Sequence, residues 1–417
     1  MRFAVVILAW ILAAGLPGTH SDGEAQYDLL LKGGLVIDPK NNIKALMDVA
    51  IAGGKIALVA PQIPDSQAKK TVNVAGYLVT PGLLDIHAHY YPVSSIGVMP
   101  DSALQSGVTT AVDAGSSGPA NFEHFYQTNI KRARTRVLAF LNIVSTGMAV
   151  PANEQDPEQM DVERAVEMIR RYPGVIIGVK TAHYWTKEPF DAQHPPWVAV
   201  DQARTAAEKT GRPMMVDFYG REGRSYRDLL LEHMRPGDIH THVLGRGFDP
   251  VVDYDTGKVY DYMFEAQKRG ILFDLGHGAG SFWFRTAVPA LKNGFLPDSI
   301  STDVHTGSVN GPAIDMVGVM SKTLNLGLPL EDVIRRSTLN PAREIRRPEF
   351  GHLSVGAGAD IAVLELRKGS FGFWDCGRGK IIGTQKLEAM MTLRDGNIVW
   401  DREGLSMEDW RKLPKMY

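Results

Sequence analysis

The stretch Thr80-Pro-Gly-Leu-Leu-Asp-Ile-His87-Ala-His89 decides how the rest of the chain can be interpreted. An apolar run typical of a buried strand ends here in two histidines that flank an alanine. Alternate side chains of a strand point to the same face, so both imidazoles could bind one metal ion. Alone, such a pair is a weak signal, and its weight depends on how the other strands end.

Further apolar runs also end in an ionisable residue, namely Lys180, Asp217, His242, His277 or Asp303. Strands are expected at 78–89, 108–115, 136–144, 175–182, 213–219, 238–244, 271–277 and 299–305, with helical patterns between most of them, such as 162–171, 225–234 and 260–269. This alternation predicts an α/β fold, a (β/α)8 TIM barrel, whose chemistry lies at the C-terminal ends of its strands. A doubly wound open sheet is the alternative, weakened because no Gly-rich phosphate loop follows the first strand.

Both ends of the chain carry a different pattern. Residues 27–38 resemble two short strands around a Gly-Gly turn, and residues 48–59, 358–365 and 389–400 resemble β-hairpin segments in the same way. Packing both ends together predicts a small β-sandwich. The expected organisation is a signal peptide at 1–25, the N-terminal segment of the sandwich at 26–77, the barrel at 78–345, and the C-terminal segment of the sandwich with a tail at 346–417.

The first residues have the composition of a secretory signal. Met1-Arg2 precedes an apolar run of about 14 residues, too short for a spanning helix, followed by small and polar residues. Cleavage is expected between Gly18 and Ala25, which predicts a periplasmic or secreted protein without a stable membrane anchor; an uncleaved anchor is the alternative. The single cysteine, Cys376, excludes an intrachain disulfide.

The composition is that of an ordinary globular protein. The chain has 417 residues, of which 44% are hydrophobic and 22% charged, and its net charge is −2. Without a basic face, nucleic-acid binding has little support. A small-molecule substrate is expected, and a homo-oligomer remains open.

Each candidate site residue has a chemical rationale. His87 and His89 are expected metal ligands. Burial at the end of an apolar strand would lower the pKa of Lys180, so its amine could add carbon dioxide as a carbamate and bridge two metals, unless the head group reaches solvent. His242, nearer the strand end than His240, is the expected ligand of that pair. Asp303 is expected to bind metal and to take the proton of a metal-bound water.

Other residues are candidates for substrate contacts. His277, before a Gly-rich aromatic loop, could polarise a substrate carbonyl, with a structural role as an equal alternative. Asp85 could fix a histidine tautomer. The substrate-binding candidates are Tyr90, Tyr219, Arg224 and Arg285, although any single arginine could instead be a solvated charge at the rim.

Together these residues resemble the amidohydrolase superfamily, in its deacetylase-like branch near the dihydroorotases. The resemblance covers nearly all of the chain after its apolar start. It includes the segment Gly351-His-Leu-Ser-Val-Gly-Ala-Gly-Ala-Asp-Ile-Ala-Val. It implies two divalent ions, with zinc as the expected metal, bridged by carboxylated Lys180. Asp217 departs from the pattern, because it stands where a histidine ligand is usual. A carboxylate can also bind zinc, so Asp217 is kept as a ligand, and its charge and hardness could select a different second metal.

The sequence therefore predicts an exported metal-dependent hydrolase that cleaves an amide, a cyclic amide or an acyl ester. A metal-bound hydroxide attacks the carbonyl and Asp303 is the general base. A lyase or isomerase on the same scaffold is the alternative, and a non-catalytic binding protein is a weaker one.

Overall fold

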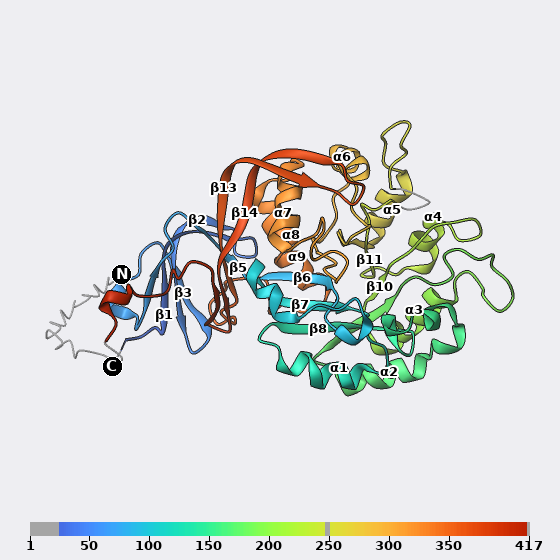
Figure 1. Ribbon diagram of the computed structural model, residues 1–417, viewed down its shortest axis with the longest axis horizontal. Coiled ribbons are helices and arrows are strands. Elements are labelled where there is room, and N and C mark those ends of the chain that lie inside the picture. The colour runs from blue at the N-terminus through green and yellow to red at the C-terminus, as the bar shows by residue number, and fades with distance from the viewer. Residues whose placement is uncertain (1–24, 247–250, 415–417) are drawn as a thin grey trace, which may run out of the picture.

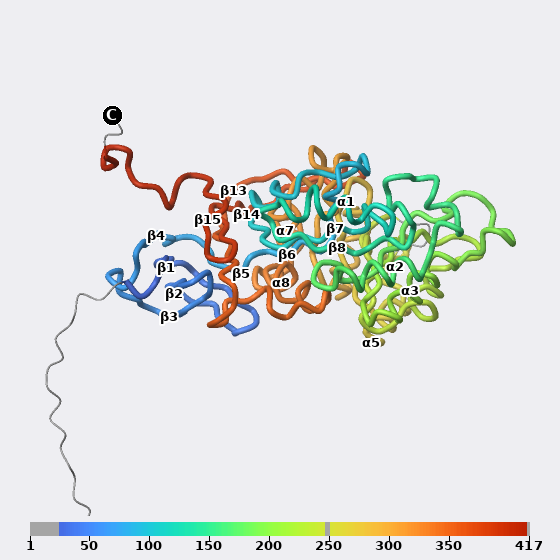
Figure 2. Tube along the Cα trace, turned by 90° about the horizontal axis from the view of Figure 1, so that it is seen from below, coloured from blue at the N-terminus to red at the C-terminus, as the bar shows by residue number. Residues whose placement is uncertain are grey.

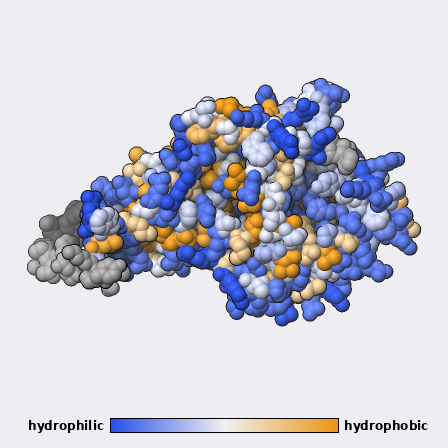
Figure 3. Space-filling view, in the orientation of Figure 1, coloured by the Kyte–Doolittle hydropathy of each residue, from blue (hydrophilic) through white to orange (hydrophobic). Residues whose placement is uncertain are grey.

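The computed structural model describes residues 25–246 and 251–414. A sheet of long strands occupies one end of the molecule, and a barrel with its helices occupies the other (Figures 1 and 2). All but the last residue of the predicted signal peptide lies outside the described residues. In the described portion of the chain, no helix is long and apolar enough to span a membrane. The face drawn in Figure 3 is mostly hydrophilic, with separate small hydrophobic areas.

The barrel is built on seven parallel strands that neighbour one another in chain order. They fall within seven of the eight ranges expected from the sequence, and the later ones are short. Their bounds are β6 (Leu83–Ala88), β7 (Val108–Ala114), β8 (Arg136–Asn142), β9 (Ile176–Thr181), β10 (Met214–Val216), β11 (Ile239–His240) and β12 (Leu272–Phe273). The expected α/β barrel is thus present.

The eighth expected strand, 299–305, closes the barrel without being a regular strand. It makes one parallel bridge on each side, Asp274 with Ser299 and Ala88 with Val304. The amide of Asp303 donates to the carbonyl of His87 at 2.6 Å. Because the backbone of Asp303 has a φ of +47°, the segment bends instead of extending. The last and the first strand are therefore joined by an irregular segment.

The first expected strand, 78–89, proves to be two strands in two different sheets. β5 (Leu78–Pro81) pairs with β1 (Leu29–Asp38) and with β13 (Ile361–Trp374), whereas β6 belongs to the barrel. Gly82 separates them, and a side chain there would meet Thr109, because an added Cβ would lie 2.2 Å from Oγ1. The expectation of one continuous strand was wrong because Pro81-Gly82 lets the chain change sheets.

The end sheet takes strands from both ends of the chain. Its order is β15-β14-β13-β5-β1-β2-β3, with β4 pairing with β1, so β5 joins the N-terminal strands to the C-terminal ones. This confirms that the two ends pack together, but the strands form one hydrogen-bonded sheet, and the two-layer sandwich remains a prediction. The other members are β2 (Ile43–Ala52), β3 (Lys55–Ala60), β4 (Thr71–Asn73), β14 (Lys380–Arg394) and β15 (Asn397–Asp401).

The helices follow from local sequence. α2 (Val162–Arg171) begins where the Asp161 side chain accepts from the amide of Arg164, and it buries Ala165 and Ile169. The helix expected at 225–234 begins as α4 (Tyr226–Asp228) and widens into a π-helical turn, and the one expected at 260–269 is α5 (Asp261–Arg269). The rest are α1 (Phe122–Thr128), α3 (Val198–Thr210), α6 (Phe284–Lys292), α7 (Met316–Asn325), α8 (Leu330–Arg336) and α9 (Leu339–Glu344).

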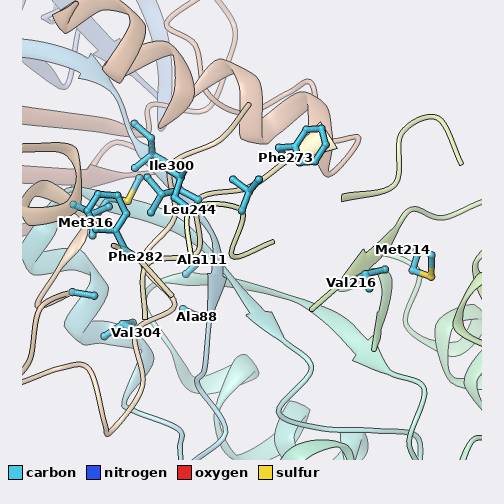
Figure 4. Packing of buried hydrophobic residues seen from close by; sticks show 14 of the residues in the cluster. Ala88, Ala111, Met214, Val216, Leu244, Phe273, Phe282, Ile300, Val304 and Met316 are labelled. Atoms are coloured by element: carbon cyan, nitrogen blue, oxygen red, sulfur yellow. The ribbon is translucent and has the colours of Figure 1, made fainter. Parts of the chain in front are cut away.

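The main hydrophobic core joins the strands to the helices. Leu244, Phe282 and Ile300 come from three different segments after the strands and belong to one buried cluster with Met316 of α7 (Figure 4). A second cluster combines residues of β6 to β11 with Ala342 of α9 and with Ile345, which follows that helix. These clusters hold the strand ends, and hence the residues that follow them, in fixed positions.

Candidate metal centre and active site

His87, His89 and Asp303 form a buried cluster at the strand ends. One ligand atom from each lies within 4.8 Å of the others, and no other described group of histidine, cysteine, aspartate or glutamate side chains is that compact. Oδ1 of Asp303 lies 3.1 Å from Nε2 of His89 and 3.5 Å from Nε2 of His87. Two imidazole nitrogens and a carboxylate oxygen facing one another are a donor set that suits a divalent ion such as zinc.

Both imidazoles use Nδ1 for a hydrogen bond to a hydroxyl group, which leaves Nε2 available to a metal ion. Nδ1 of His87 lies 2.7 Å from Oγ1 of Thr241, which donates to Asp274 at 2.7 Å. Nδ1 of His89 lies 2.8 Å from Oγ of Ser116. With each Nδ1 as the donor, both Nε2 atoms keep a lone pair for a metal ion.

Asp274 is the carboxylate that supports His87. Besides Thr241, it accepts from the hydroxyls of Ser299 at 2.9 Å and Ser301 at 2.7 Å. The sequence pattern assigned no clear role to Asp274 and favoured Asp85 for this task. The Asp85 carboxylate instead accepts from the amide and hydroxyl of Thr302 at 3.0 and 2.5 Å, so it ties β6 to the closing segment.

Lys180 lies beside this cluster and is fully buried. Its Nζ is 3.4 Å from Nε2 of His87, and burial lowers the pKa of the amine, although Asp217 and Asp303 act in the opposite direction. Gly115 makes room for the lysine stem, because an added Cβ would lie 2.6 Å from Cγ of Lys180. The structure thus places the lysine amine directly beside the metal cluster.

Asp217 and His242 form a second group on the neighbouring strands. Nε2 of His242 lies 3.4 Å from Oδ2 of Asp217, while its Nδ1 lies 2.7 Å from the carbonyl of Gly276. The rings of His242 and His87 are 4.8 Å apart, so the two groups adjoin. Both ring nitrogens of His240 have other partners, because they contact the hydroxyl of Tyr226 and the carbonyl of Val216.

Two residues near Asp217 were missed by the sequence analysis. Nε2 of His183 lies 3.3 Å from Oδ2 of Asp217, and its Nδ1 lies 3.2 Å from the buried carboxylate of Glu154. Burial opposes the imidazolium, but Asp217 and Glu154 together raise the pKa of His183 to about 10. A histidine shortly after Lys180 was the available signal, whereas nothing in the sequence marked Glu154.

His277 does not turn a free ring nitrogen toward the metal cluster. Its Nε2 lies 2.8 Å from Nζ of Lys322, its Nδ1 lies 2.9 Å from the carbonyl of Gly278, and its ring stacks on Phe282. An added Cβ on Gly278 would lie 2.2 Å from Oδ2 of Asp303. His277 therefore holds the backbone that lies against Asp303, in line with the structural alternative.

Of the substrate candidates, Tyr219 and Arg224 line a small cavity with Asp217 and His183, and Tyr219 also lines a second cavity with Asp217 and His242. This second cavity of about 90 Å³ is lined by Asp217, Phe218, Tyr219, Tyr226, His242, Val243, Gly245, Arg246, Val251, Gly280 and Ser281. Tyr90 is fully buried, and its hydroxyl has no hydrogen-bond partner among the described residues. The Arg224 guanidinium donates to the carbonyls of Tyr184 and Tyr219 at 2.9 and 3.3 Å. Arg285 lines a separate cavity of about 530 Å³. Arg246 lines both this cavity and the cavity of about 90 Å³.

The negative charge at the centre is held by histidines. Burial alone would raise the pKa of Asp303, but the imidazoles of His87, His305 and His89 outweigh it and keep the pKa well below its ordinary value.

Asp303, His242 and His183 all have positive φ angles, a conformation that is strained for these residues. Such strain gathered around one set of charged side chains is typical of a functional site.

Comparison with known proteins identifies the family. A deacetylase of Agrobacterium fabrum, Atu3266, is 34% identical over 331 residues, which cover 76% of this chain and 78% of the relative. The chain belongs to the amidohydrolase family. The model of that family matches residues 284–399. A deacetylase of Enterococcus faecalis is 28% identical over 89% of this chain and 99% of the relative.

Solved structures agree with this family. The crystal structure of an adenine deaminase superposes with a TM-score of 0.82 at 27% identity, covering 90% of this amidohydrolase and 100% of that chain. A dihydroorotase gives a TM-score of 0.77 at 29% identity, covering 89% and 99%. The protein is thus a metal-dependent hydrolase that acts on carbon–nitrogen bonds, and it belongs to the branch that contains deacetylases and dihydroorotases.

Proposed function

We propose that this amidohydrolase removes an acyl group from a small N-acyl amine or acyl ester, as a deacetylase. The observation that carries the proposal is the convergence of His87, His89, Asp303 and Lys180 at the barrel mouth, in a chain whose two relatives described above are named deacetylases. A cyclic amide is the second candidate substrate, favoured by the likeness to a dihydroorotase.

The donor set fits a centre with two divalent ions, for which zinc is our proposed metal. His87, His89 and Asp303 would hold the first ion, and Asp217 and His242 would contribute to the second, with Lys180 as a bridging carbamate. When bound, the ions would lower the pKa of a water molecule and polarise the substrate carbonyl.

The side chains of the chain itself would carry the proton. Asp303, as general base, accepts a proton from the attacking water and returns it to the leaving nitrogen or oxygen. Its carboxylate can do so because the His87 and His89 imidazoles keep it ionised. The phenol of Tyr219 lies next to Asp217 in the cavity and can contact the substrate. His277, through Gly278, keeps Asp303 in place.

A panel of substrates tests this function. Zinc-loaded enzyme is incubated with N-acetyl amino acids, O-acetyl hydroxy acids, cyclic ureides and adenine, and the products are measured by mass spectrometry. Release of acetate is expected, with one ¹⁸O atom incorporated from labelled water. Turnover without incorporation of labelled oxygen would instead show a lyase or isomerase, and deamination of adenine would contradict the deacetylase.

We further propose that the enzyme is exported, because its start resembles a signal peptide. N-terminal sequencing of the mature enzyme should begin between residues 18 and 25. An N-terminus at Met1 would contradict export by cleavage.

A further inference from the structure

The Asp217 carboxylate lies between two imidazoles. Its Oδ2 is 3.3 Å from Nε2 of His183 and 3.4 Å from Nε2 of His242. Ligand atoms on a tetrahedral zinc ion with bonds of about 2.0–2.1 Å are about 3.3–3.4 Å apart. Both contacts therefore have the spacing of neighbouring ligands on one ion.

His183 is oriented as a metal ligand would be. Nδ1 lies 3.2 Å from the carboxylate of Glu154, so Nε2 faces Asp217. Glu154 is only 4% exposed, and His183 is its one ion-pair partner among the described residues. A metal-binding imidazole usually donates its other ring N–H to a carboxylate. This hydrogen bond fixes the tautomer of the histidine and increases the basicity of the nitrogen that binds the metal.

The backbone of His183 supports the same interpretation. Its φ of +56° lies in the left-handed region, which few non-glycine residues adopt. With the backbone in this conformation, Nε2 of the imidazole lies 3.3 Å from the Asp217 carboxylate. Backbone outliers of this kind gather at functional sites.

We propose that His183, supported by Glu154, supplies the imidazole that Asp217 replaces, so that a second divalent ion is held by His183, Asp217 and His242 beside Lys180. The proposal rests on the binuclear centre proposed above. It explains how the site can keep two neutral nitrogen ligands although the residue that follows strand β10 is an aspartate. Asp217 then adds one negative charge, which strengthens the binding of a divalent ion.

The three residues would have to draw closer together around an ion. Among the described residues, only His87, His89 and Asp303 bring one ligand atom each within 4.8 Å of one another. The His183 side chain is 42% exposed, so solvent lies against part of it and packing leaves room for this small shift. The alternative is a purely structural contact between His183 and Asp217.

Metal content separates the two roles. His183→Asn suits the left-handed backbone but is too short to replace the imidazole. By mass spectrometry of the purified, zinc-loaded full chain, the wild type should hold two ions and His183→Asn one. Glu154→Gln should keep two ions, with the weaker one bound about 10–100-fold less tightly in a chelator competition. The double variant His183→Asn with Asp217→His should hold two ions again, because it restores an imidazole.

His194 in the same loop provides the matched control. It also has a carboxylate partner, Asp191 at 2.9 Å, and its ring stacks on Trp185, away from the metal residues. His194→Asn should keep two ions. Two tightly held ions in His183→Asn would overturn the role of His183 and leave the proposed hydrolase intact. Fewer than two ions in the wild type would instead refute the binuclear centre itself.

Discussion

Nε2 of His89 lies 3.1 Å from Oδ1 of Asp303, although one residue follows the first strand of the barrel and the other lies in the segment that closes it. The segment that closes the barrel therefore also supplies a residue of the metal centre. Any change that displaces residues 299–305 is expected to reach the metal ligands. This coupling makes Asp303 and its immediate surroundings the most informative sites for mutagenesis.

Replacing the Asp303 carboxylate should abolish turnover. In Asp303→Asn the amide cannot accept a proton from water and is a poor metal ligand, so kcat should fall more than about 100-fold. The rate of acetate release and the metal content of the same sample measure this. Circular dichroism should show an unchanged fold. A loss smaller than about 100-fold would reduce Asp303 to a structural aspartate.

A methyl group at Gly278 should displace the Asp303 carboxylate. The added Cβ would lie 2.2 Å from Oδ2, and the φ of +53° already disfavours any side chain. Gly278→Ala should therefore lose metal and most activity. Gly280→Ala is the control, because an added Cβ there meets no atom within 4 Å. Equal metal affinities in both variants would show that the loop yields without moving Asp303.

Removing the Lys180 amine should remove the carbamate bridge that we propose. Lys180→Ala leaves a cavity at a fully buried position beside His87 and should lose metal and activity. Acetate or propionate with bicarbonate could fill that cavity and restore some of both. In the wild type, mass spectrometry under native conditions should detect the mass of one bound carbon dioxide. Full metal content and rate in Lys180→Ala would contradict the bridge.

The sequence predicted the barrel because its signal is local and repeated. Apolar runs that end in His87, Lys180 or His242 are visible without knowledge of the fold. The change of sheet at Pro81-Gly82 was not, because the apolar run continues across it. Residue 303 likewise interrupts the last strand through a φ that its sequence context does not announce.

The supporting residues of the site were harder to predict than its ligands. Asp274, His183 and Glu154 act through contacts between segments that are distant in the chain. A pattern of strand ends identifies the residues at the mouth but not those behind them. His277 shows that a histidine at a strand end need not be a metal ligand. It ends a strand as a ligand would, yet Lys322 from a distant helix occupies its ring nitrogen.

The burial of Lys322 gives a prediction about pH. Burial lowers the pKa of Lys322 to about 8 in the folded chain, whereas an unfolded lysine titrates at about pH 10.4. Between these values the unfolded chain binds more protons than the folded one, so the free energy of unfolding rises with pH. Below this window both states are protonated and this contribution does not change with pH.

Lys322→Met keeps the length of the side chain but removes its titration. From pH about 8 to about 10.5, the wild type should gain roughly 1–3 kcal/mol in its free energy of unfolding relative to this variant. Urea unfolding at several pH values, followed by tryptophan fluorescence, measures the difference. Lys292→Met, at an exposed position at the end of α6, should follow the wild type. Parallel curves for the wild type and Lys322→Met would show that Lys322 is not neutral in the folded enzyme over this range.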